Sequence, residues 1–345
     1  MSEQLFSIGL GVGTQSSTGD WLEIFYPAPV LNPSEDLGKA IIANVGYSGG
    51  NQALELNKDQ LGALESALRE VGEAAQADIV KAFKTSSRPL VVTILASDSE
   101  PASVPEGYLK LHLLSHRLVK PHQVNLAGLF GVLPNVAWTS HGAIDLEELP
   151  QAQLAARLRG ETISVDCVDK FPKMTNYVVP TGVRIAHTAR VRLGAYIGEG
   201  TTVMHEGFVN FNAGTEGPGM IEGRVSAGVF IGAGSDLGGS SSTMGTLSGG
   251  GNIVISVGKE CLLGANAGIG IPLGDRCTVE AGLYITAGSK VVILDESGKS
   301  VETVRARDLA GKSDLLFRRN STNGAVECLT NKSAIELNEE LHANN

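Results

Sequence analysis

The chain has 345 residues, 42% of them hydrophobic and 19% charged, with a formal net charge of −10. Its length is enough for two domains with cores of their own, and its composition is that of a folded globular protein rather than a disordered one. The excess of acidic residues argues against non-specific binding of nucleic acids, which depends on clustered Lys and Arg. It does not exclude a small anionic ligand, which a few arginines can hold locally.

The cysteines and the first residues of the sequence indicate a cytoplasmic protein. Cys167, Cys261, Cys277 and Cys328 are widely spaced and form no CxxC pair, so we expect reduced thiols rather than a zinc site or a disulfide framework. Residues 1–20 lack the basic start and apolar run of a secretory signal. No apolar stretch approaches the ~20 residues of a membrane span.

The first part of the chain predicts a mixed α/β domain over residues 1–180, with a linker at its end. Leu61, Leu64, Leu68 and Val71 have the spacing of one face of an amphipathic helix. A short β-branched run further on is typical of a buried strand. The expected elements are helix 57–83, strand 90–96, helix 108–119 and helix 145–159, followed by a transition between Pro172 and Pro180.

Beyond residue 181 the hydrophobic period changes to six. Glycine marks the change, because residues 181–290 hold 25 of the 43 glycines whereas the first 180 residues hold 15. Neither the helical period of 3.6 nor strand alternation places an aliphatic residue at every sixth position. The positions are Ile185, Val191, Ile197, Val203 and Val209, then Val225, Ile231 and Leu237, then Val257, Leu263 and Ile269, and, after a shift of two, Ile271, Cys277 and Leu283.

A hexapeptide repeat explains this period and predicts a parallel β-helix over residues 181–294. Three hexads close one triangular coil, in which each aliphatic residue points inward and stacks on its counterpart 18 positions later. Glycine-heavy segments at 214–220 and 245–252 interrupt the repeat, and we expect them to be loops. The alternative is a generic glycine-rich all-β domain. Residues 295–345, where the hexads stop, are expected to form a C-terminal extension.

Five segments of the chain carry a resemblance to a known family. They are MHEGFVNFNAGTEGPGMIEGRVSAG at 204–228, MGTLSGGG at 244–251, CLLGANAGIGIPLGD at 261–275, VEAGLYITAG at 279–288 and LLFRRNS at 315–321. With these segments the chain resembles the tetrahydrodipicolinate N-succinyltransferases, in particular the subgroup with a large N-terminal domain. The resemblance runs from about residue 183 to the C-terminus and is weaker over the first 150 residues.

The resemblance implies a left-handed β-helix and an acyltransferase. The reaction it implies moves a succinyl group from the co-substrate succinyl-coenzyme A to the amino group of acyclic tetrahydrodipicolinate (L-2-amino-6-oxopimelate). This is a step in the succinylase branch of diaminopimelate and lysine biosynthesis. The resemblance further implies a homotrimer with active sites between subunits, small-molecule substrates and no tightly bound cofactor.

Glu222 and Arg224, in the segment IEGRVSAG, match two functional positions of the family. Glu222 matches the catalytic carboxylate, which either accepts a proton from the attacking amine or accepts the acyl group as a mixed anhydride. Arg224 matches a residue that contacts succinyl-coenzyme A, through the carboxylate that a guanidinium fork binds. An extended segment would place the two side chains on one face. From spacing alone, a solvent-facing corner glutamate and a salt-bridged surface arginine remain open.

The remaining matched positions have small, polar or basic residues. Gly245 matches a candidate oxyanion donor for the thioester carbonyl. Small residues permit close approach of the pantetheine arm, and arginines attract the phosphates of the nucleotide end, although corner glycines and solvated arginines look the same in sequence. The other residues implied to bind substrate or coenzyme A are Gly239, Ser242, Ala265, Glu280, Ala281, Gly288, Arg305, Arg318, Arg319, Asn320 and Ser321.

Glu206 matches a position that binds magnesium on the trimer axis in some members of the family. The companion aspartate of that site is missing, because Ala189 stands in its place. A magnesium ligand and a hydrated glutamate near the axis therefore both remain open for Glu206.

Two other functions are compatible with a hexapeptide β-helix. The first is another acyl-coenzyme A-dependent N- or O-acyltransferase with an acetyl donor, and turnover with acetyl- versus succinyl-coenzyme A discriminates it. The second is a non-catalytic scaffold, which long runs of identical outward residues would favour; the outward positions here are irregular.

Overall fold

The computed structural model describes residues 4–245 and 253–330. The chain divides into two compact units. The N-terminal unit comprises residues 1–119, 123–172 and 176–178, and the C-terminal unit comprises residues 120–122, 173–175 and 179–345. No helix in the described ranges is long and apolar enough to span a membrane.

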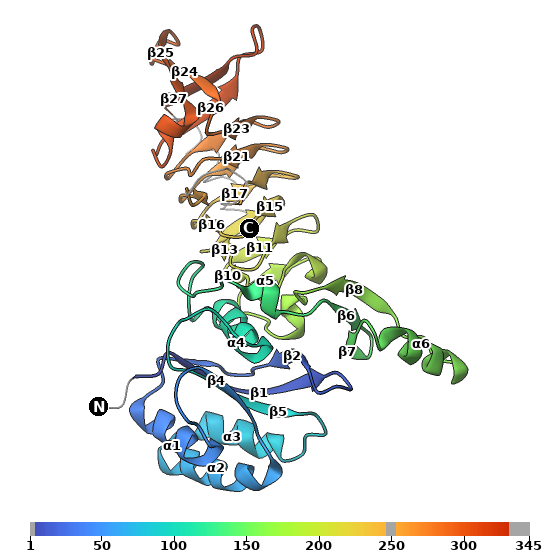
Figure 1. Ribbon diagram of the computed structural model, residues 1–345. Helices are drawn as coiled ribbons and strands as arrows, with labels where there is room; N and C mark the ends of the chain where they lie inside the picture. The colour runs from blue at the N-terminus through green and yellow to red at the C-terminus, as the bar shows by residue number, and fades with distance from the viewer. Residues whose placement is uncertain (1–3, 246–252, 331–345) are drawn as a thin grey trace. The chain divides into compact units, whose positions relative to one another are not determined.

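The N-terminal unit is built on an antiparallel sheet with the strand order β2-β1-β5-β4, and β3 pairs with the start of β1. Helices α1, α2 and α3 cover one face of this sheet and α4 lies on the other (Figure 1). The strands are β1 (Ser7–Gln15), β2 (Trp21–Phe25), β3 (Val30–Leu31), β4 (Gln52–Glu55) and β5 (Leu90–Leu95). The helices are α1 (Glu35–Val45), α2 (Lys58–Glu70), α3 (Ala74–Phe83) and α4 (Val104–Ser115).

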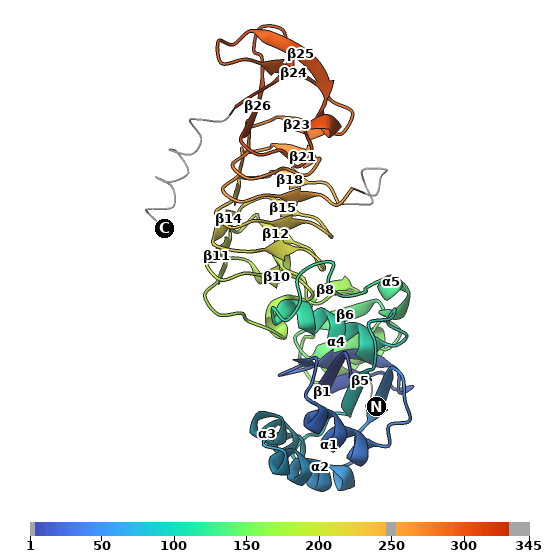
Figure 2. The ribbon, with the colours of Figure 1, turned by 90° about the vertical axis from the view of Figure 1, so that its left-hand side faces the viewer.

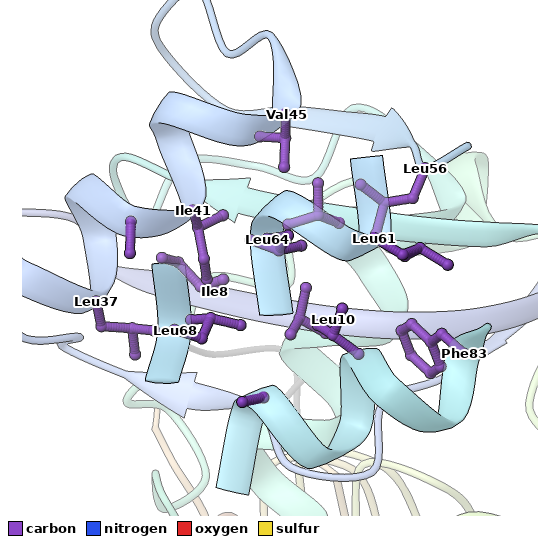
Figure 3. Packing of buried hydrophobic residues seen from close by; sticks show 14 of the residues in the cluster. Ile8, Leu10, Leu37, Ile41, Val45, Leu56, Leu61, Leu64, Leu68 and Phe83 are labelled. Carbon is purple, nitrogen blue, oxygen red and sulfur yellow. The ribbon is translucent and has the colours of Figure 1, made fainter. Parts of the chain in front are cut away.

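The main hydrophobic core lies between this sheet and helices α1–α3. Ile8 and Leu10 of β1 point toward the apolar sides of the helices (Figure 3). The expected strand at 90–96 is confirmed as β5, and all six of its residues are buried. Helices on both faces of the sheet explain why buried positions run continuously along β5 rather than alternating with exposed ones.

The single helix expected over 57–83 is wrong: the segment forms two helices, α2 and α3. A capping box between Asn57 and Gln60 starts α2. The chain then turns at Gly72, whose φ of +80° is in the left-handed region that glycine adopts without steric cost. Val71, expected on the apolar face, is 38% exposed because it lies at this break.

Two further helices are present but shifted from their expected ranges. α4 was expected at 108–119 and begins at Val104, with Pro105 in its first turn, where a missing N–H costs nothing. It ends at Ser115, before Arg117, which has a φ of +62°. The helix expected at 145–159 is α6 (Leu149–Leu158), because the residues up to Asp145 form a strand instead.

α4 is buried along its length and carries polar side chains into the interior. The Lys110 side chain is fully buried, and its ammonium group donates to Asp98 Oδ1 (2.5 Å) and to the carbonyl oxygens of Ser99 (2.6 Å) and Asn125 (2.9 Å). All three of its donors are thus used, which is what makes a buried ammonium tolerable.

His112 of α4 is held as a neutral ring. Its Nδ1 lies 2.8 Å from the Tyr108 carbonyl oxygen, and its Nε2 accepts the Tyr26 backbone N–H at 3.2 Å. Because an N–H donates into Nε2, the proton of the neutral ring belongs on Nδ1. Burial lowers the pKa of His112 from an ordinary value of 6.5 to about 3.

This lowered pKa predicts an acid-sensitive N-terminal unit. Between pH 6.5 and pH 3 the unfolded chain binds one more proton at His112 than the folded chain. The free energy of unfolding therefore falls by about 1.4 kcal/mol for each unit by which the pH is lowered in this range. Urea unfolding at pH 7.5 and pH 5.0, followed by tryptophan fluorescence, tests this, since both tryptophans (Trp21 and Trp138) belong to the N-terminal unit. The wild type should lose about 2 kcal/mol more between the two pH values than His112→Gln. Equal losses in the two proteins would contradict the assignment.

The N-terminal unit also contains a smaller antiparallel sheet with the order β7-β6-β8. Its strands are β6 (Val136–Thr139), β7 (Gly142–Asp145) and β8 (Val165–Asp169), and α5 (Leu129–Val132) precedes it.

The C-terminal unit is a parallel β-helix with three sheets (Figure 2). The first sheet contains β10 (Tyr196–Ile197), β13 (Gly214–Thr215), β16 (Phe230–Ile231) and β19 (Ser256–Val257). The second contains β12 (Phe208–Val209), β15 (Arg224–Val225), β18 (Ser242–Thr243), β21 (Gly268–Gly270) and β23 (Tyr284–Thr286). The third begins with β9 (Arg184–Ile185), β11 (Thr201–Val203), β14 (Gly219–Ile221), β17 (Asp236–Leu237), β20 (Leu262–Leu263) and β22 (Thr278–Val279).

The third sheet continues into strands from the end of the chain. β26 (Leu315–Arg319) pairs in parallel with β22, and then β27 (Val326–Thr330), β24 (Lys290–Leu294) and β25 (Ser300–Arg305) follow in that order. The chain therefore leaves the coil after β23, forms a hairpin of β24 and β25, and returns to the coil with β26.

The interior of the β-helix is the predicted aliphatic column. The positions of the six-residue period from Val191 to Leu283 are at most 3% exposed, and Ile185 at the first coil is half-buried. The six-residue repeat therefore predicted the core correctly.

The expected spacing of 18 residues per coil holds only for some strand pairs, Arg224 with Ser242 among them. Ile197 pairs with Thr215 and Val203 with Ile221, each 18 positions on. Later steps, such as Val209 to Val225 and Leu263 to Val279, are two residues shorter. In the last coil the strand register continues the column through Val279 and Ile285, not through the predicted Cys277 and Leu283, although all four residues are buried.

The loop expected at 214–220 is wrong, because β13 and β14 occupy this segment. The inward residue here is Thr215, which is 2% exposed. Its hydroxyl lies 2.8 Å from the Thr201 hydroxyl, so each satisfies the other inside the coil. Because this inward residue is a threonine rather than an aliphatic residue, the six-residue hydrophobic period cannot be seen here in the sequence. Of the second expected loop, 245–252, only Gly245 lies within the described residues.

Candidate active site

Glu222 lies at a corner of the β-helix, between β14 and β15, which belong to different sheets. Gly223 makes this corner possible: a Cβ on it would lie 2.1 Å from Ser241 Oγ. The Glu222 backbone N–H donates to the Leu237 carbonyl oxygen at 2.9 Å, which ties the corner to the next coil. The half-buried Glu222 side chain is thus carried on a rigid turn. Gly223 is a residue that sequence reasoning missed, although its place between the two matched residues was a signal.

The structure brings Glu222 and Gly239 together. A Cβ on Gly239 would lie 3.5 Å from the Cδ and Oε2 atoms of Glu222. The glycine leaves one side of the carboxylate open, and a larger residue there would occupy the space through which a substrate atom approaches.

Arg224 and Ser242 form a second pair, one coil apart. They are partners in the parallel register of β15 and β18. The exposed Arg224 guanidinium donates from Nη2 to Ser242 Oγ at 2.8 Å. Residues 222 and 224 do not share one extended strand as expected, since the corner separates them. Arg224 is positioned by Ser242 rather than by an ion pair with Glu222.

Gly245 follows β18 on the same coil as Ser242. A Cβ on Gly245 would lie 3.3 Å from the Ala227 carbonyl oxygen, so the chain is closely packed there. Its expected role as an oxyanion donor stays a prediction.

A column of small residues runs along the corner above Glu222. The register pairs Leu237 with Leu263 and Leu263 with Val279, and β22 with β26 beyond them. The residue two positions after each of these paired residues lies at the same corner of its coil. From coil to coil these corner residues are Gly223, Gly239, Ala265, Ala281 and finally Arg319. At ~4.8 Å per coil, the column is about 19 Å long. Ala265 and Ala281 are exposed, so an extended ligand can lie against them.

Glu280 connects this column to the C-terminal strands. Its backbone N–H donates to the Phe317 carbonyl oxygen at 2.9 Å, and its Oε2 accepts the Arg319 backbone N–H at 2.6 Å. Gly288 lies further along the chain, just after β23, and a Cβ there would meet no heavy atom within 4 Å. Gly288 is therefore open to a ligand on its outer side.

The basic residues at the end of the chain have different surroundings. Arg318 Nε donates to Glu327 Oε2 (2.9 Å), and Asn320 Nδ2 donates to Glu327 Oε1 (2.7 Å). The bonds from Asn320 and Arg318 lower the pKa of Glu327. Arg319 donates from Nη1 to the Gly324 carbonyl oxygen at 3.2 Å, and Ser321 is exposed.

Arg305 does not lie next to this group. Strands β24 and β27 separate it from β26, and in the hairpin it pairs with Lys290. Lys290 is exposed and adds a cation that sequence reasoning missed. The sequence contained a signal for Lys290: it follows the last regular coil directly, close to the residues expected to bind the nucleotide end of coenzyme A.

Glu206 is engaged by basic side chains in one chain. Its carboxylate lies 3.1 Å from Arg190 Nη2 and 2.6 Å from His205 Nδ1, and the His205 hydrogen bond lowers the pKa of Glu206. In the described part of the chain, no three His, Cys, Asp or Glu side chains are grouped so that they could hold a metal ion. These surroundings do not fit a magnesium site made by a single chain.

Comparisons with known proteins show the family of the chain. Three family models match: tetrahydrodipicolinate N-succinyltransferase N-terminal at residues 57–131, tetrahydrodipicolinate N-succinyltransferase middle at 133–173, and hexapeptide repeat of succinyl-transferase at 254–287. The 2,3,4,5-tetrahydropyridine-2,6-dicarboxylate N-succinyltransferase of Pseudomonas putida is 69% identical over 345 residues, which is the whole of both chains. The protein of that name from Vibrio cholerae is 59% identical over 340 residues, 99% of each chain.

A solved structure shows the same fold. It is described as a 2,3,4,5-tetrahydropyridine-2-carboxylate N-succinyltransferase from Campylobacter jejuni, is 32% identical, and covers 96% of this chain and 94% of its own with a TM-score of 0.88. The predicted fold class, a mixed α/β domain followed by a left-handed parallel β-helix and a short C-terminal extension, is confirmed. With identities of 59–69% over essentially the full length of its relatives, the chain belongs to the tetrahydrodipicolinate N-succinyltransferase family.

Proposed function

We propose that this enzyme transfers the succinyl group of succinyl-coenzyme A to the amino group of acyclic tetrahydrodipicolinate, in the succinylase branch of diaminopimelate and lysine biosynthesis. The observation that carries the proposal is the pairing of a carboxylate at a glycine corner (Glu222 beside Gly239) with a guanidinium on the next strand (Arg224 on Ser242). A base and an anion-binding group two residues apart in the chain suit an amine acceptor and a donor with a free carboxylate.

The chemistry follows from the carboxylate. The amine of the substrate must lose a proton to attack the thioester carbonyl, and Glu222 accepts that proton. The new N–C bond forms, the C–S bond breaks, and the proton returns from Glu222 to the leaving thiolate sulfur. Gly245 is assigned as a backbone N–H donor to the oxyanion of the tetrahedral intermediate. In the alternative, Glu222 would accept the succinyl group first, and hydroxylamine would then trap a succinylated enzyme in the absence of the amine.

Arg224 should select the donor. If its guanidinium binds the free carboxylate of the succinyl group, Arg224→Gln loses a charge-assisted hydrogen bond of ~1.5–3 kcal/mol, and kcat/KM for succinyl-coenzyme A should fall about tenfold to about a hundredfold. Acetyl-coenzyme A lacks that carboxylate, so its slow turnover should change little. Thiol release measured with each donor checks this. Arg184→Gln, at an exposed arginine of β9, is the matched control.

Equal losses with both donors would show that Arg224 does not read the succinyl carboxylate. Faster turnover of acetyl- than succinyl-coenzyme A by the wild type would instead favour the acetyltransferase alternative.

The column from Gly239 to Ala281 is proposed to hold the pantetheine arm of the coenzyme. Its residues are small, Ala265 and Ala281 are exposed, and the backbone groups follow the corner at a regular spacing. Arg319, with Ser321 and Asn320, stands at the end of this column and is assigned to the nucleotide phosphates. Arg318 and Asn320 both donate to Glu327, so Arg318 helps to hold Asn320 in place. Arg305 and Lys290 add positive charge from the hairpin of β24 and β25.

We further propose that the enzyme works as a homotrimer with sites shared between chains. Ligand sites are usually concave and enclose most of their ligand. In one chain, however, Arg224, Ala265, Ala281 and Gly288 are exposed. A neighbouring prism packed against this face would supply the missing wall.

The proposed location is the cytoplasm, where coenzyme A thioesters are made. None of the four cysteines, all of which are described, forms a disulfide, as a reducing compartment requires.

A further inference from the structure

The second sheet of the β-helix contains a strand whose two outward residues are both glycines. In β21 the middle residue, Ile269, is fully buried in the interior of the coil, so Gly268 and Gly270 face outward. Strand β18 precedes β21 in this sheet and β23 follows it (Figure 2). A side chain from each of these neighbours lies over one of the two glycines.

Tyr284 of β23 covers Gly268. The two residues are partners in the parallel register, and the three heavy atoms nearest to a Cβ on Gly268 would all belong to the Tyr284 ring, at 2.1–2.6 Å. Met244, which follows β18, covers Gly270 in the same way, because its Sδ would lie 2.7 Å from a Cβ there. The glycines therefore let a phenol ring and a thioether lie flat against the sheet.

This apolar surface, the Tyr284–Met244 platform, is open to solvent in one chain. Tyr284 is 44% exposed and Met244 is half-buried. The inner side of the ring shields the Gly268 backbone, which is a common arrangement of aromatic residues beside strand glycines. The outer side of the ring has no such structural use, and a ligand can contact it.

The platform lies alongside the proposed path of the donor. Arg224, Ser242, Gly268 and Tyr284 are successive partners in the register of the second sheet. At ~4.8 Å per strand, β21 is about 10 Å from the strand that carries Arg224. The exposed Ala281, which belongs to the column of small residues, precedes Tyr284 by three residues on the same coil.

The order of chemical groups along this part of the β-helix matches their order in the donor. The Arg224 guanidinium suits the succinyl carboxylate, and the basic residues of β26 suit the nucleotide phosphates. The uncharged platform lies between these two ends. In succinyl-coenzyme A the uncharged part between the charged ends is the pantetheine arm, a flexible chain of methylene and amide groups. An aromatic ring and a thioether can pack against such a chain.

We propose that Tyr284 and Met244 bind the pantetheine arm of succinyl-coenzyme A from the side of the second sheet. Together with the column of small residues, they give the arm two walls on one chain. Since succinyl-coenzyme A is taken as the donor, this assignment rests on the proposed function.

Isothermal titration calorimetry on the full-length enzyme tests the platform with two probes. Coenzyme A contains the pantetheine arm, and adenosine 3′-phosphate 5′-diphosphate has the same nucleotide end without it. We expect Tyr284→Ala to weaken the binding of coenzyme A about tenfold, because the arm loses its contact with the ring, and to leave the nucleotide affinity unchanged. Tyr284→Phe keeps the ring and should bind coenzyme A within about twofold of the wild type.

Tyr196→Ala is the matched control. Tyr196 is an outward tyrosine of the first sheet that also pairs with a glycine, Gly214, and it lies outside the proposed donor path. This variant should bind both probes as the wild type does.

Gly268→Ala tests the position of the ring. The added Cβ would lie 2.1 Å from a ring atom, so the ring must move and coenzyme A should bind more weakly. In a Tyr284→Ala background the same change should have no further effect, since no ring remains to be displaced. Additive losses in the double variant would contradict the role of the ring.

The outcomes separate the platform from the proposed function. Equal affinity of the wild type and Tyr284→Ala for coenzyme A would overturn the platform and leave succinyl transfer standing. Equal losses for both probes would also overturn it, because a general structural effect does not distinguish the arm from the nucleotide. A wild type that does not bind coenzyme A would overturn the proposed donor together with the platform.

Discussion

Replacing Glu222 with glutamine should lower kcat about 10²- to 10⁴-fold, the range typical for loss of a general base. The amide has the same shape as the carboxylate but cannot accept the proton of the attacking amine. The corner that carries residue 222 is fixed by Gly223 and by the backbone bond to Leu237, neither of which the change affects. Steady-state thiol release with saturating succinyl-coenzyme A and amine measures the loss.

Glu260→Gln is the matched control, because Glu260 is an exposed glutamate on another coil of the same helix. Its kcat should stay close to that of the wild type. A Glu222→Gln enzyme that keeps more than about a tenth of wild-type kcat would exclude both proposed roles of this carboxylate.

Mixing two inactive variants should restore activity. Glu222→Gln removes the carboxylate, and Gly288→Trp places a large ring where a Cβ meets no other atom, so the fold should tolerate it while the coenzyme path is blocked. In a ring of three chains, each interface is formed by two different faces, one from each neighbour. If Glu222 and Gly288 of one site come from adjacent chains, random 1:1 exchange leaves about a quarter of the sites free of both changes.

The measurement is the activity per total chain after exchange, and exchange is verified by native mass spectrometry of differently tagged subunits. Recovery toward a quarter of wild-type activity supports the shared site. Mixed trimers without recovery would place Glu222 and Gly288 in the site of a single chain, and the shared-site proposal would have to be withdrawn.

The interior of the β-helix could be predicted because its period is a direct consequence of the fold. Inward positions generally need an apolar residue small enough for the narrow interior of the β-helix. The spacing of Val191, Ile197 and Val203 therefore predicts the coil even when the residues that pack against them are unknown. Thr215 could not be predicted in the same way. Its inward position is tolerated only because the Thr201 hydroxyl satisfies it, and that contact depends on coil length.

The resemblance proposes the candidate site residue by residue, but it does not predict how these residues are arranged. Glu222 and Gly239 are 17 positions apart, and Arg224 and Ser242 are 18 apart, so one fixed coil length does not place both pairs. The shortened coils decide which residues meet. The column of small residues above Glu222 became visible only from the strand register.

The N-terminal unit shows which features escape pattern reasoning. The spacing of apolar residues does not show where a glycine adopts a left-handed backbone conformation. Gly72 does so and separates two helices in a segment whose sequence predicted one. Buried polar residues such as Lys110 and His112 look like surface residues until the partners that satisfy them are known. The carboxylate of Glu23 likewise joins residues far apart in the sequence, because it accepts the hydroxyl groups of both Thr14 and Tyr177.

The reaction itself gives the most direct test of the account. The purified enzyme is incubated with succinyl-coenzyme A and tetrahydrodipicolinate, free thiol is measured, and the product is identified by mass spectrometry. The account predicts one thiol released for each N-succinylated amine formed, with little thiol released when the amine is omitted or acetyl-coenzyme A replaces the donor. Thiol release without the amine, or an acetylated product formed faster than the succinylated one, would contradict it.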